Sequence, residues 1–264
     1  MNDVPDDFSL NRTQLSNLLD KIGGITGLKD GQWFAKLIGH SLRAFNINGN
    51  GQYFKNKYPK MNEDQIASKL ISVAARNAGL IGAGAGAAMT ASEIGSFFTA
   101  GAAVPFATTL GIAGVGADVL SSTWIQLRLI AAIAAIYGPN LDPDDPEDVL
   151  LAIEFFALSK ASDAGGSVSM KLGGAITGKA VKSIASKERL KAIQAIVLKS
   201  TGKKLLQRHL VKSAIPIASI AIGGGFNYKV TKAIGRRAMT QSKIRGEEHR
   251  NNNGHSTELA VSEP

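Results

Sequence analysis

Side chains that could do chemistry are rare in the middle of this sequence, and their rarity makes each of them informative. Between Asn77 and Leu127 the only charged residues are Glu93 and Asp118, in a background of Gly, Ala, Ile and Leu. Polar groups in such surroundings are costly to bury unless they are paired. The candidates in and just after this stretch are Glu93, Asp118, Gln126, Arg128 and Tyr137.

Most of these candidates lie on one predicted helix that runs from Asp118 to Tyr137. With 100° of rotation per residue, Gln126 is turned about 80° from Asp118 in one direction and Arg128 about 80° in the other. We interpret them as an internal polar clamp, in which Asp118 or Glu93 pairs with Arg128 and fixes helix packing. A ligand or ion site and a catalytic Asp/Glu pair remain open as alternatives.

A second set of polar residues lies on a predicted basic helix that reaches about Met239. Asn227, Thr231 and Gly235 are spaced four residues apart, so one face of this helix carries a small hydrogen-bonding stripe, which favours close helix packing. The glycines in front of the helix could present free amides to a phosphate group. The candidates for binding a lipid phosphate are Gly223, Gly224, Gly225, Asn227, Lys229, Lys232, Arg236 and Arg237.

Other motifs are explained better by structure than by chemistry. Gly173–Ala180 nearly matches a P-loop, but Ala180 replaces the hydroxyl residue that holds magnesium and no convincing strand precedes it. The acidic turn 142–148 suits a helix start capped by Asp145 and lacks the spaced ligands of a calcium loop. The chain has no cysteine, and its four histidines form no ligand cluster. We therefore assign no metal site, no cofactor and no catalytic residue.

The positive charge of the chain is concentrated in its last third. Residues 171–245 contain 17 Lys and Arg and one acid, Glu188, whereas the net charge of the whole chain is +9. Amphipathic helices with lysine on their polar face suit contact with anionic lipid headgroups. An ordinary solvated face is the alternative. Nucleic-acid binding is disfavoured because aromatic side chains for base stacking are nearly absent there.

Helical periodicity dominates the sequence, so we predict an all-α fold, a single helical bundle built around a Gly/Ala-rich apolar hairpin. The hairpin is expected in Ile94–Ala117, an uncharged run with Pro105 near its middle. It is long enough to span a bilayer, which takes about 20 apolar residues. A membrane span, a hairpin in a soluble core and a segment lying in the membrane interface all remain open. The expected parts are a variable N-terminal helical region (1–60), a central helical domain (61–241) and a disordered polar tail (242–264).

Two stretches of the sequence resemble a known family. Gly114–Gly138, GVGADVLSSTWIQLRLIAAIAAIYG, is followed by the acidic DPDDPEDVL of Asp142–Leu150. The second stretch, Pro216–Ala238, reads PIASIAIGGGFNYKVTKAIGRRA. In this order they are similar to the EcsC family of bacterial proteins, named after a protein encoded beside an ABC exporter. The likeness, from about Ile66 to Met239, makes 61–241 an EcsC-like domain. It implies a helical bacterial protein in or beside a membrane, and it implies no reaction or ligand.

These features predict a non-catalytic, membrane-associated protein on the cytoplasmic side, which binds an anionic lipid surface and supports a transport or envelope process. The expected partners are the membrane, its anionic lipids and a membrane transporter or envelope protein. The acidic N-terminus lacks the basic and apolar regions of a secretory signal. The main alternative is a soluble cytoplasmic protein that encloses a lipid or another apolar ligand. A more distant one is a hydrolase or toxin-like effector that uses Glu93, Asp118 and Arg128.

Overall fold

The computed structural model describes residues 8, 12–48, 51–88, 106–138, 140–159, 198–199, 201–203, 205 and 219–261. Every named element in this part of the chain is an α-helix, which confirms the predicted all-α bundle. The helices are α1 (Arg12–Lys21), α2 (Gly24–Asp30), α3 (Trp33–Asn48), α4 (Gly51–Lys57), α5 (Glu63–Ala88), α7 (Phe106–Tyr137), α8 (Pro146–Ser159) and α12 (Ser219–Val261).

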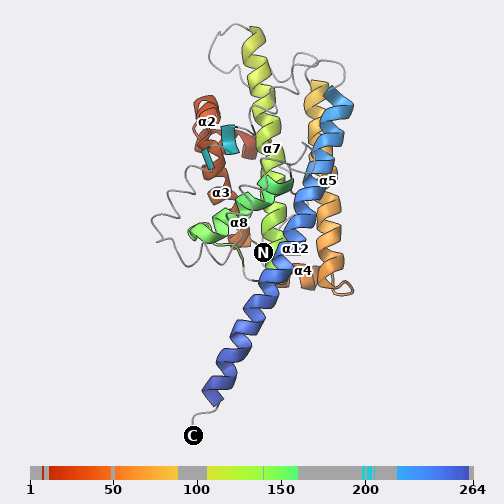
Figure 1. Ribbon diagram of the computed structural model, residues 1–264. Helices are drawn as coiled ribbons and strands as arrows, with labels where there is room; N and C mark the ends of the chain where they lie inside the picture. The colour runs from red at the N-terminus through yellow and green to blue at the C-terminus, as the bar shows by residue number, and fades with distance from the viewer. Residues whose placement is uncertain are drawn as a thin grey trace.

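Three long helices, α5, α7 and α12, run along one another and form the centre of the bundle (Figure 1). α12 is antiparallel to α5, because Gly79 lies beside Gly224 and Asp64 contacts Lys243. α7 runs in the same direction as α12. We call the end of the bundle where α5 ends and where α7 and α12 begin the upper end, and the opposite end the lower end (Figure 1).

The contact between α5 and α12 is close because both helices place small residues in it. A Cβ added at Gly235 would lie 2.6 Å from Ile71 Cγ1, and one added at Gly79 would lie 3.3 Å from the carbonyl oxygen of Gly224. α5 also buries a series of alanines, at positions 67, 74, 75 and 78. Small residues let two helix backbones approach closely, so this pair packs along most of the length of α5.

α7 is the core helix of the bundle, and it corrects one expectation. Its 32 residues begin at Phe106 and not at Asp118, because Gly and Ala residues continue the helix upstream without a break. Asp118–Tyr137 is long and apolar enough to cross a membrane, but 94% of its apolar window is buried inside the protein. Core helices of soluble proteins have the same property. Of the predicted hairpin Ile94–Ala117, residues 94–105 lie outside the described residues and the rest belongs to α7.

The N-terminal helices pack on α7 and share one hydrophobic core with it. α3 contributes Trp33, Phe34 and Phe45, which are fully buried. A Cβ added at Gly51 would collide with the carbonyl oxygen of Ala135, so the start of α4 touches the backbone of α7. The predicted regions 1–60 and 61–241 are thus joined by a common core.

α5 begins with a reciprocal cap formed by Asn62 and Gln65. Asn62 Oδ1 accepts a hydrogen bond from the Gln65 amide at 2.9 Å, and Gln65 Oε1 accepts one from the Asn62 amide at 3.0 Å. This capping box satisfies two amide groups that would otherwise lack partners.

α12 corrects the expectation of a disordered tail from Ser242. The helix continues to Val261, and its last part projects beyond the rest of the bundle (Figure 1). Ser242 is buried and Gly246 lies against the backbone of Tyr137. The polar composition of this segment is misleading, because Lys243 and Arg245 are held by acids of other helices. Residues 262–264 of the predicted tail lie outside the described residues.

Candidate functional site along helix α12

Helix α12 forms polar contacts with α5, α7 and α8, and we take these contacts as the candidate site. In the upper half, Asn227 Nδ2 donates to Asp118 Oδ1 at 3.1 Å, and Gln126 Nε2 donates to Thr231 Oγ1 at 3.0 Å. Gln126, Asn227 and Thr231 are buried. A buried polar group must be hydrogen-bonded to be tolerated, so the two pairs fix the position of α12 along α7.

The stripe Asn227, Thr231 and Gly235 therefore lies at a helix contact. Its first two members bind polar groups of α7, and Gly235 fits against Ile71 of α5 and Leu129 of α7. The spacing of four residues places all three on the inner face of α12. As a result, Asn227 is engaged in packing the bundle and does not face solvent.

At the lower end a single carboxylate joins three helices. Asp64 of α5 accepts a hydrogen bond from the Tyr137 hydroxyl at 2.7 Å and one from Lys243 Nζ at 2.5 Å. These hydrogen bonds, that of Lys243 above all, lower the pKa of Asp64. Burial and the same carboxylate raise the pKa of Tyr137. Tyr137, a predicted site residue, thus belongs to a structural contact between α5, α7 and α12.

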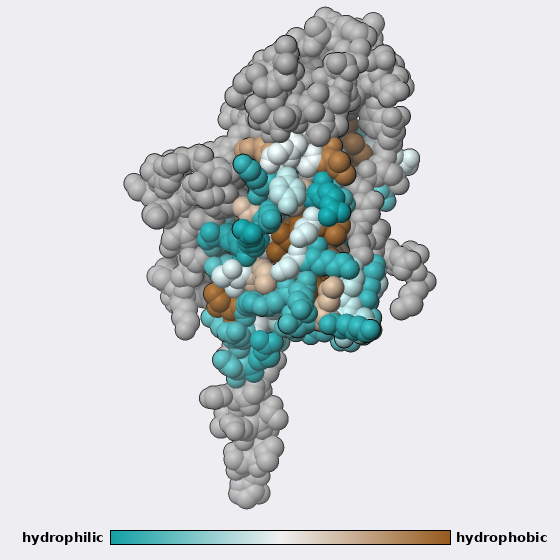
Figure 2. All heavy atoms as spheres, turned by 90° about the vertical axis from the view of Figure 1, so that its right-hand side faces the viewer, coloured by the Kyte–Doolittle hydropathy of each residue, from teal (hydrophilic) through white to brown (hydrophobic). Residues whose placement is uncertain are grey.

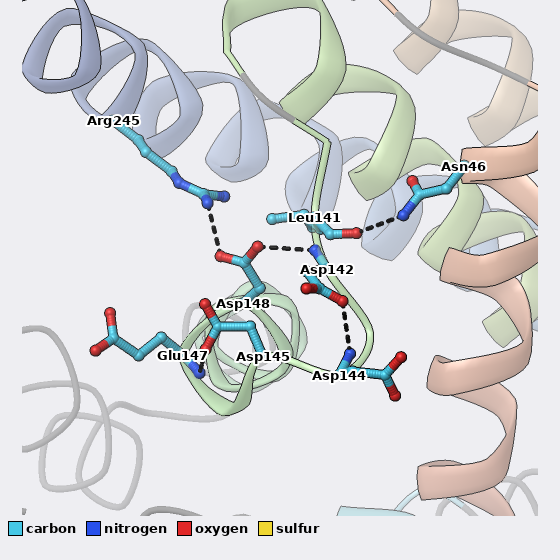
Figure 3. Close-up of polar contacts among 8 residues, drawn as sticks. All are labelled: Asn46, Leu141, Asp142, Asp144, Asp145, Glu147, Asp148 and Arg245. Atoms are coloured by element: carbon cyan, nitrogen blue, oxygen red, sulfur yellow. Dashed lines mark hydrogen bonds and ion pairs between the residues drawn. The ribbon is translucent and has the colours of Figure 1, made fainter. Parts of the chain in front are cut away.

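The acidic turn before α8 is an ordered cap with a second tie to α12 (Figure 3). Asp145 Oδ1 accepts from the Glu147 amide at 3.0 Å, as the capping prediction requires. Asp148 accepts from the Asp142 amide at 2.8 Å and from Arg245 Nη2 at 2.6 Å. Burial raises the pKa of Asp148, and Arg245 opposes that rise. The turn is therefore held by α12 as well as by its own cap.

Glu154 of α8 and Arg237 of α12 form a looser pair. The side chain of Glu154 is only 3% exposed, and its Oε1 lies 3.8 Å from Arg237 Nη2. Burial raises the pKa of Glu154, and the charge of Arg237 opposes this. Glu154 Oε1 and Arg237 Nε are buried without a hydrogen-bond partner among the described residues, as are Ser242 Oγ and Arg245 Nη1. These four atoms all belong to α8 or to the part of α12 that passes it.

The predicted clamp between Asp118 and Arg128 is not formed. The two residues are ten positions apart on α7, which separates them by about 15 Å along the axis. The guanidinium of Arg128 instead lies 5.9 Å from the ring centre of Phe45 and 5.7 Å from that of Trp124. Burial lowers the pKa of Arg128. Glu93, the other predicted acid of the clamp, lies outside the described residues.

The predicted phosphate loop is also corrected. α12 begins at Ser219, ahead of Gly223, Gly224 and Gly225. Only the first few amides of a helix lack an intrahelical partner, so the amides of these glycines are engaged in helical hydrogen bonds. The glycines thus cannot offer free donors to a phosphate.

The charges of the bundle are segregated along its length. The acids of α5 and α12 lie towards the lower end, where Glu63 contacts Lys55 at 2.8 Å and Asp64 contacts Lys243 at 2.5 Å. Higher up, Arg76, Lys229 and Arg236 are exposed and form no ion pair with a described residue. Exposed apolar groups lie near them: Leu80 is 66% exposed, and Tyr228, whose ring lies 5.6 Å from Lys232 Nζ, is 39% exposed.

We call this set of residues the upper basic face; its members are Arg76, Leu80, Tyr228, Lys229, Lys232 and Arg236. Figure 2, which views the molecule from the side of α5 and α12, shows hydrophilic residues over most of the described surface and some hydrophobic residues nearer the upper end. Of the predicted phosphate ligands, Lys229, Lys232 and Arg236 belong to this face, whereas Arg237 turns towards Glu154.

Several site residues were missed by the sequence argument. Asp64 and Lys243 are 179 positions apart, and nothing in either neighbourhood signals the other. Glu154 did carry a signal, because it is the only charge in the apolar run 149–159 and a lone carboxylate there needs a partner. The described residues contain no cluster of three side chains suited to a metal ion.

The fold and these contacts define the class of the protein: a helical bundle whose last helix is tied by polar pairs to three others. A family model described as the EcsC protein family matches residues 91–246, which is more than half of the chain. The chain belongs to the EcsC family. The match starts after α5, later than the sequence resemblance suggested, and ends at Gly246 beside the lower-end contacts. In comparisons with curated proteins and with solved structures, no match was found.

Proposed function

We propose that this protein is a non-catalytic, membrane-associated protein that docks on the anionic lipid of the cytoplasmic membrane surface with its upper end. In this proposal the upper basic face supplies the charge, and docking supports a transport or envelope process. The membrane and its anionic lipids are the primary partners, and a membrane transporter or envelope protein is a further one.

The observation that carries the proposal is the segregation of charge. On α5 and α12 the acids lie towards the lower end, whereas the parts of these helices that carry Arg76, Lys229, Lys232 and Arg236 contain no acid. Exposed Leu80 and Tyr228 beside lysine and arginine are the composition expected at a membrane interface, where aromatic and aliphatic groups sit among headgroups.

The uncharged run Ile94–Ala117 adds to this argument through its place in the chain. Its residues 94–105 fall between α5 and α7 in the sequence and its residues 106–117 are the first part of α7; the end of α5 and the start of α7 both lie at the upper end of the bundle (Figure 1). The apolar part of α7 that follows, Asp118–Tyr137, is buried inside the protein and does not supply an anchor. The upper basic face thus extends along α5 and α12 towards the end at which this apolar sequence lies.

The electrostatic free energy of docking is large enough to recruit the protein reversibly to the membrane. Each lysine or arginine near an anionic membrane contributes about 1 kcal/mol at modest salt. The four basic residues of the upper basic face would thus contribute about 4 kcal/mol, roughly a thousandfold in affinity. Screening by salt should weaken the attraction steeply.

Vesicle flotation of the purified chain tests the proposal. Vesicles of phosphatidylcholine with about 30% phosphatidylglycerol should carry the protein upwards at about 50 mM salt, and much less at about 500 mM. Vesicles of phosphatidylcholine alone should bind weakly under both conditions. Equal binding to the two vesicle types would refute the electrostatic proposal. A soluble monomer that ignores vesicles and carries co-purified lipid would favour the ligand-enclosing alternative.

A further inference from the structure

The loose pair of Glu154 and Arg237 is a polar contact of α12 that neither the packing nor the proposed docking uses. Charge-assisted contacts between arginine and a carboxylate are normally about 2.7–2.9 Å long, whereas this one measures 3.8 Å. One oxygen of the carboxylate and the Nε of the guanidinium have no hydrogen-bond partner among the described residues. The carboxylate therefore receives little compensation for its burial.

The position of Arg237 connects this pair to the upper basic face. Arg237 follows Arg236 of that face in the sequence but points about 100° further round α12, towards α8, and its side chain is 34% exposed at the edge of the α8–α12 contact. As long as Glu154 is ionised, the guanidinium is attracted inwards and its charge is neutralised. Lys229, Lys232 and Arg236 have no acid partner of this kind among the described residues.

Other charged groups lie on the helices packed against α8, and they do not replace Arg237. They are Lys36, His40 and Arg43 on α3, Asp118 and Arg128 on α7, and the other charged residues of α12, its glutamates among them. Arg43 contacts Asp144 and Arg245 contacts Asp148. Arg237 is the one described residue whose charge acts on the pKa of Glu154, which burial raises above its ordinary value.

We propose that Glu154 is a proton-operated switch on membrane docking: when its carboxylate takes up a proton from solvent, Arg237 loses its counterion and becomes available to an anionic headgroup. This inference rests on the proposed function. Lowering the pH should strengthen docking, since it neutralises Glu154 and adds one net positive charge near the upper basic face. An anionic surface at about −30 mV also lowers the local pH by about half a unit, so docking and protonation favour each other.

Glu154→Gln tests the switch, because the amide has the shape of the carboxyl and no charge. At about pH 7.5 this variant should bind anionic vesicles about fivefold more tightly than the wild type, the effect of one added cation near the surface. The ratio of the two affinities should approach one as the pH falls through the raised pKa of Glu154, because the wild type then carries a neutral side chain as well. Comparing the two proteins removes the common contribution of the histidines.

Two further variants make the test specific. Asp148→Asn adds the same net charge beside Arg245, about 12 Å farther along α12 than Arg237, and at about 0.15 M salt, where the Debye length is about 8 Å, it should leave vesicle binding within about twofold of the wild type. In an Arg237→Gln background, Glu154→Gln should have no effect, since the cation that it releases is gone. Equal melting temperatures confirm that each variant is folded.

The outcomes separate the switch from the proposed function. A wild type that binds anionic vesicles with the same affinity as Glu154→Gln at every pH would overturn the switch and leave the docking proposal standing. An equal gain from Asp148→Asn would also overturn it, because net charge alone would then explain the effect. A wild type that binds no anionic vesicle at any pH would overturn both.

Discussion

Asp64 shows how much one residue can organise in this bundle. Its carboxylate is the acceptor for a hydroxyl from α7 and an ammonium from α12, and its pKa is lowered mainly by the second of these. The stabilisation is present above the ordinary pKa of an aspartate and is lost as the pH falls through the lowered value.

Removing the hydroxyl of Tyr137 tests this contact. Tyr137→Phe should lower the free energy of unfolding by about 1–2 kcal/mol, the worth of a hydrogen bond to a charged group, because the ring stays buried and only the donor is lost. Urea denaturation monitored by circular dichroism measures the change. The control is Tyr53→Phe, whose hydroxyl meets Lys57 on an exposed helix surface and should contribute less than about 0.5 kcal/mol. Equal losses in the two variants would contradict the assigned role of Asp64.

At this scale the sequence identified important residues but not their partners. Asp118 and Gln126 attract attention because they are polar within an apolar helix, and both do form buried or half-buried contacts. The partners, Asn227 and Thr231, lie more than a hundred positions away, and only tertiary packing brings them together. Arg128 does not pair with Asp118, because its half-buried guanidinium lies against two aromatic rings, whereas Glu93, the other predicted partner, lies outside the described residues.

The packing of α12 on α5 and α7 depends on a missing side chain at Gly235. A Cβ there would lie 2.6 Å from Ile71 and 3.0 Å from Leu129. Gly235→Ala should therefore destabilise the protein by about 1–2 kcal/mol, because overpacking outweighs the gain in helix propensity. The same helix offers a matched control in Gly225, where an added Cβ would meet nothing within 4 Å.

The change in the free energy of unfolding should have the opposite sign for Gly225→Ala. This variant should stabilise the protein by about 0.5–1 kcal/mol, since alanine is the better helix former and no clash opposes it. Thermal and urea unfolding of the two variants measure both signs. Stabilisation by alanine at both positions would mean that α12 does not approach α5 as closely as the structure places it.

Helix starts with a local signal were predictable, and helix ends set by distant contacts were not. Asn62 and Asp145 precede helices and carry the side chains that caps require, and both act as caps. The upstream start of α7 was missed because a Gly/Ala-rich run suggests a break. The extension of α12 past Ser242 was missed because a polar sequence looks disordered until the acids that bind it are known.

On the scale of the whole molecule, α12 contacts α5, α7 and α8 along the length of the bundle and stabilises their packing. A chain ended after Gln241 loses Lys243, Arg245 and Gly246 and leaves Asp148 buried without its cation. Removing one partner of a buried ion pair typically costs about 3–5 kcal/mol, so this truncation should lower the melting temperature strongly. A chain ended after Arg250 keeps every one of these contacts and should melt within a few degrees of the full chain. Similar melting of the two truncated chains would contradict the role of 242–250.

The overall class of the protein was open to prediction, and the arrangement of its parts was not. Periodicity and the two family-like stretches predict an all-α member of the EcsC family, which the fold and the family match confirm. The common core of the N-terminal helices and α7, and the separation of charge between the two ends, follow from how helices stack. No local pattern encodes this stacking.

The most direct test of the account compares two triple variants in flotation with anionic vesicles. Lys229→Gln, Lys232→Gln and Arg236→Gln together remove charge from the upper basic face, and Lys57→Gln, Lys60→Gln and Arg250→Gln remove the same charge from the lower part. The account predicts that the first variant loses roughly a hundredfold in affinity, about 3 kcal/mol for three cations, while the second changes by less than about threefold. Equal losses in the two variants would contradict docking by the upper end.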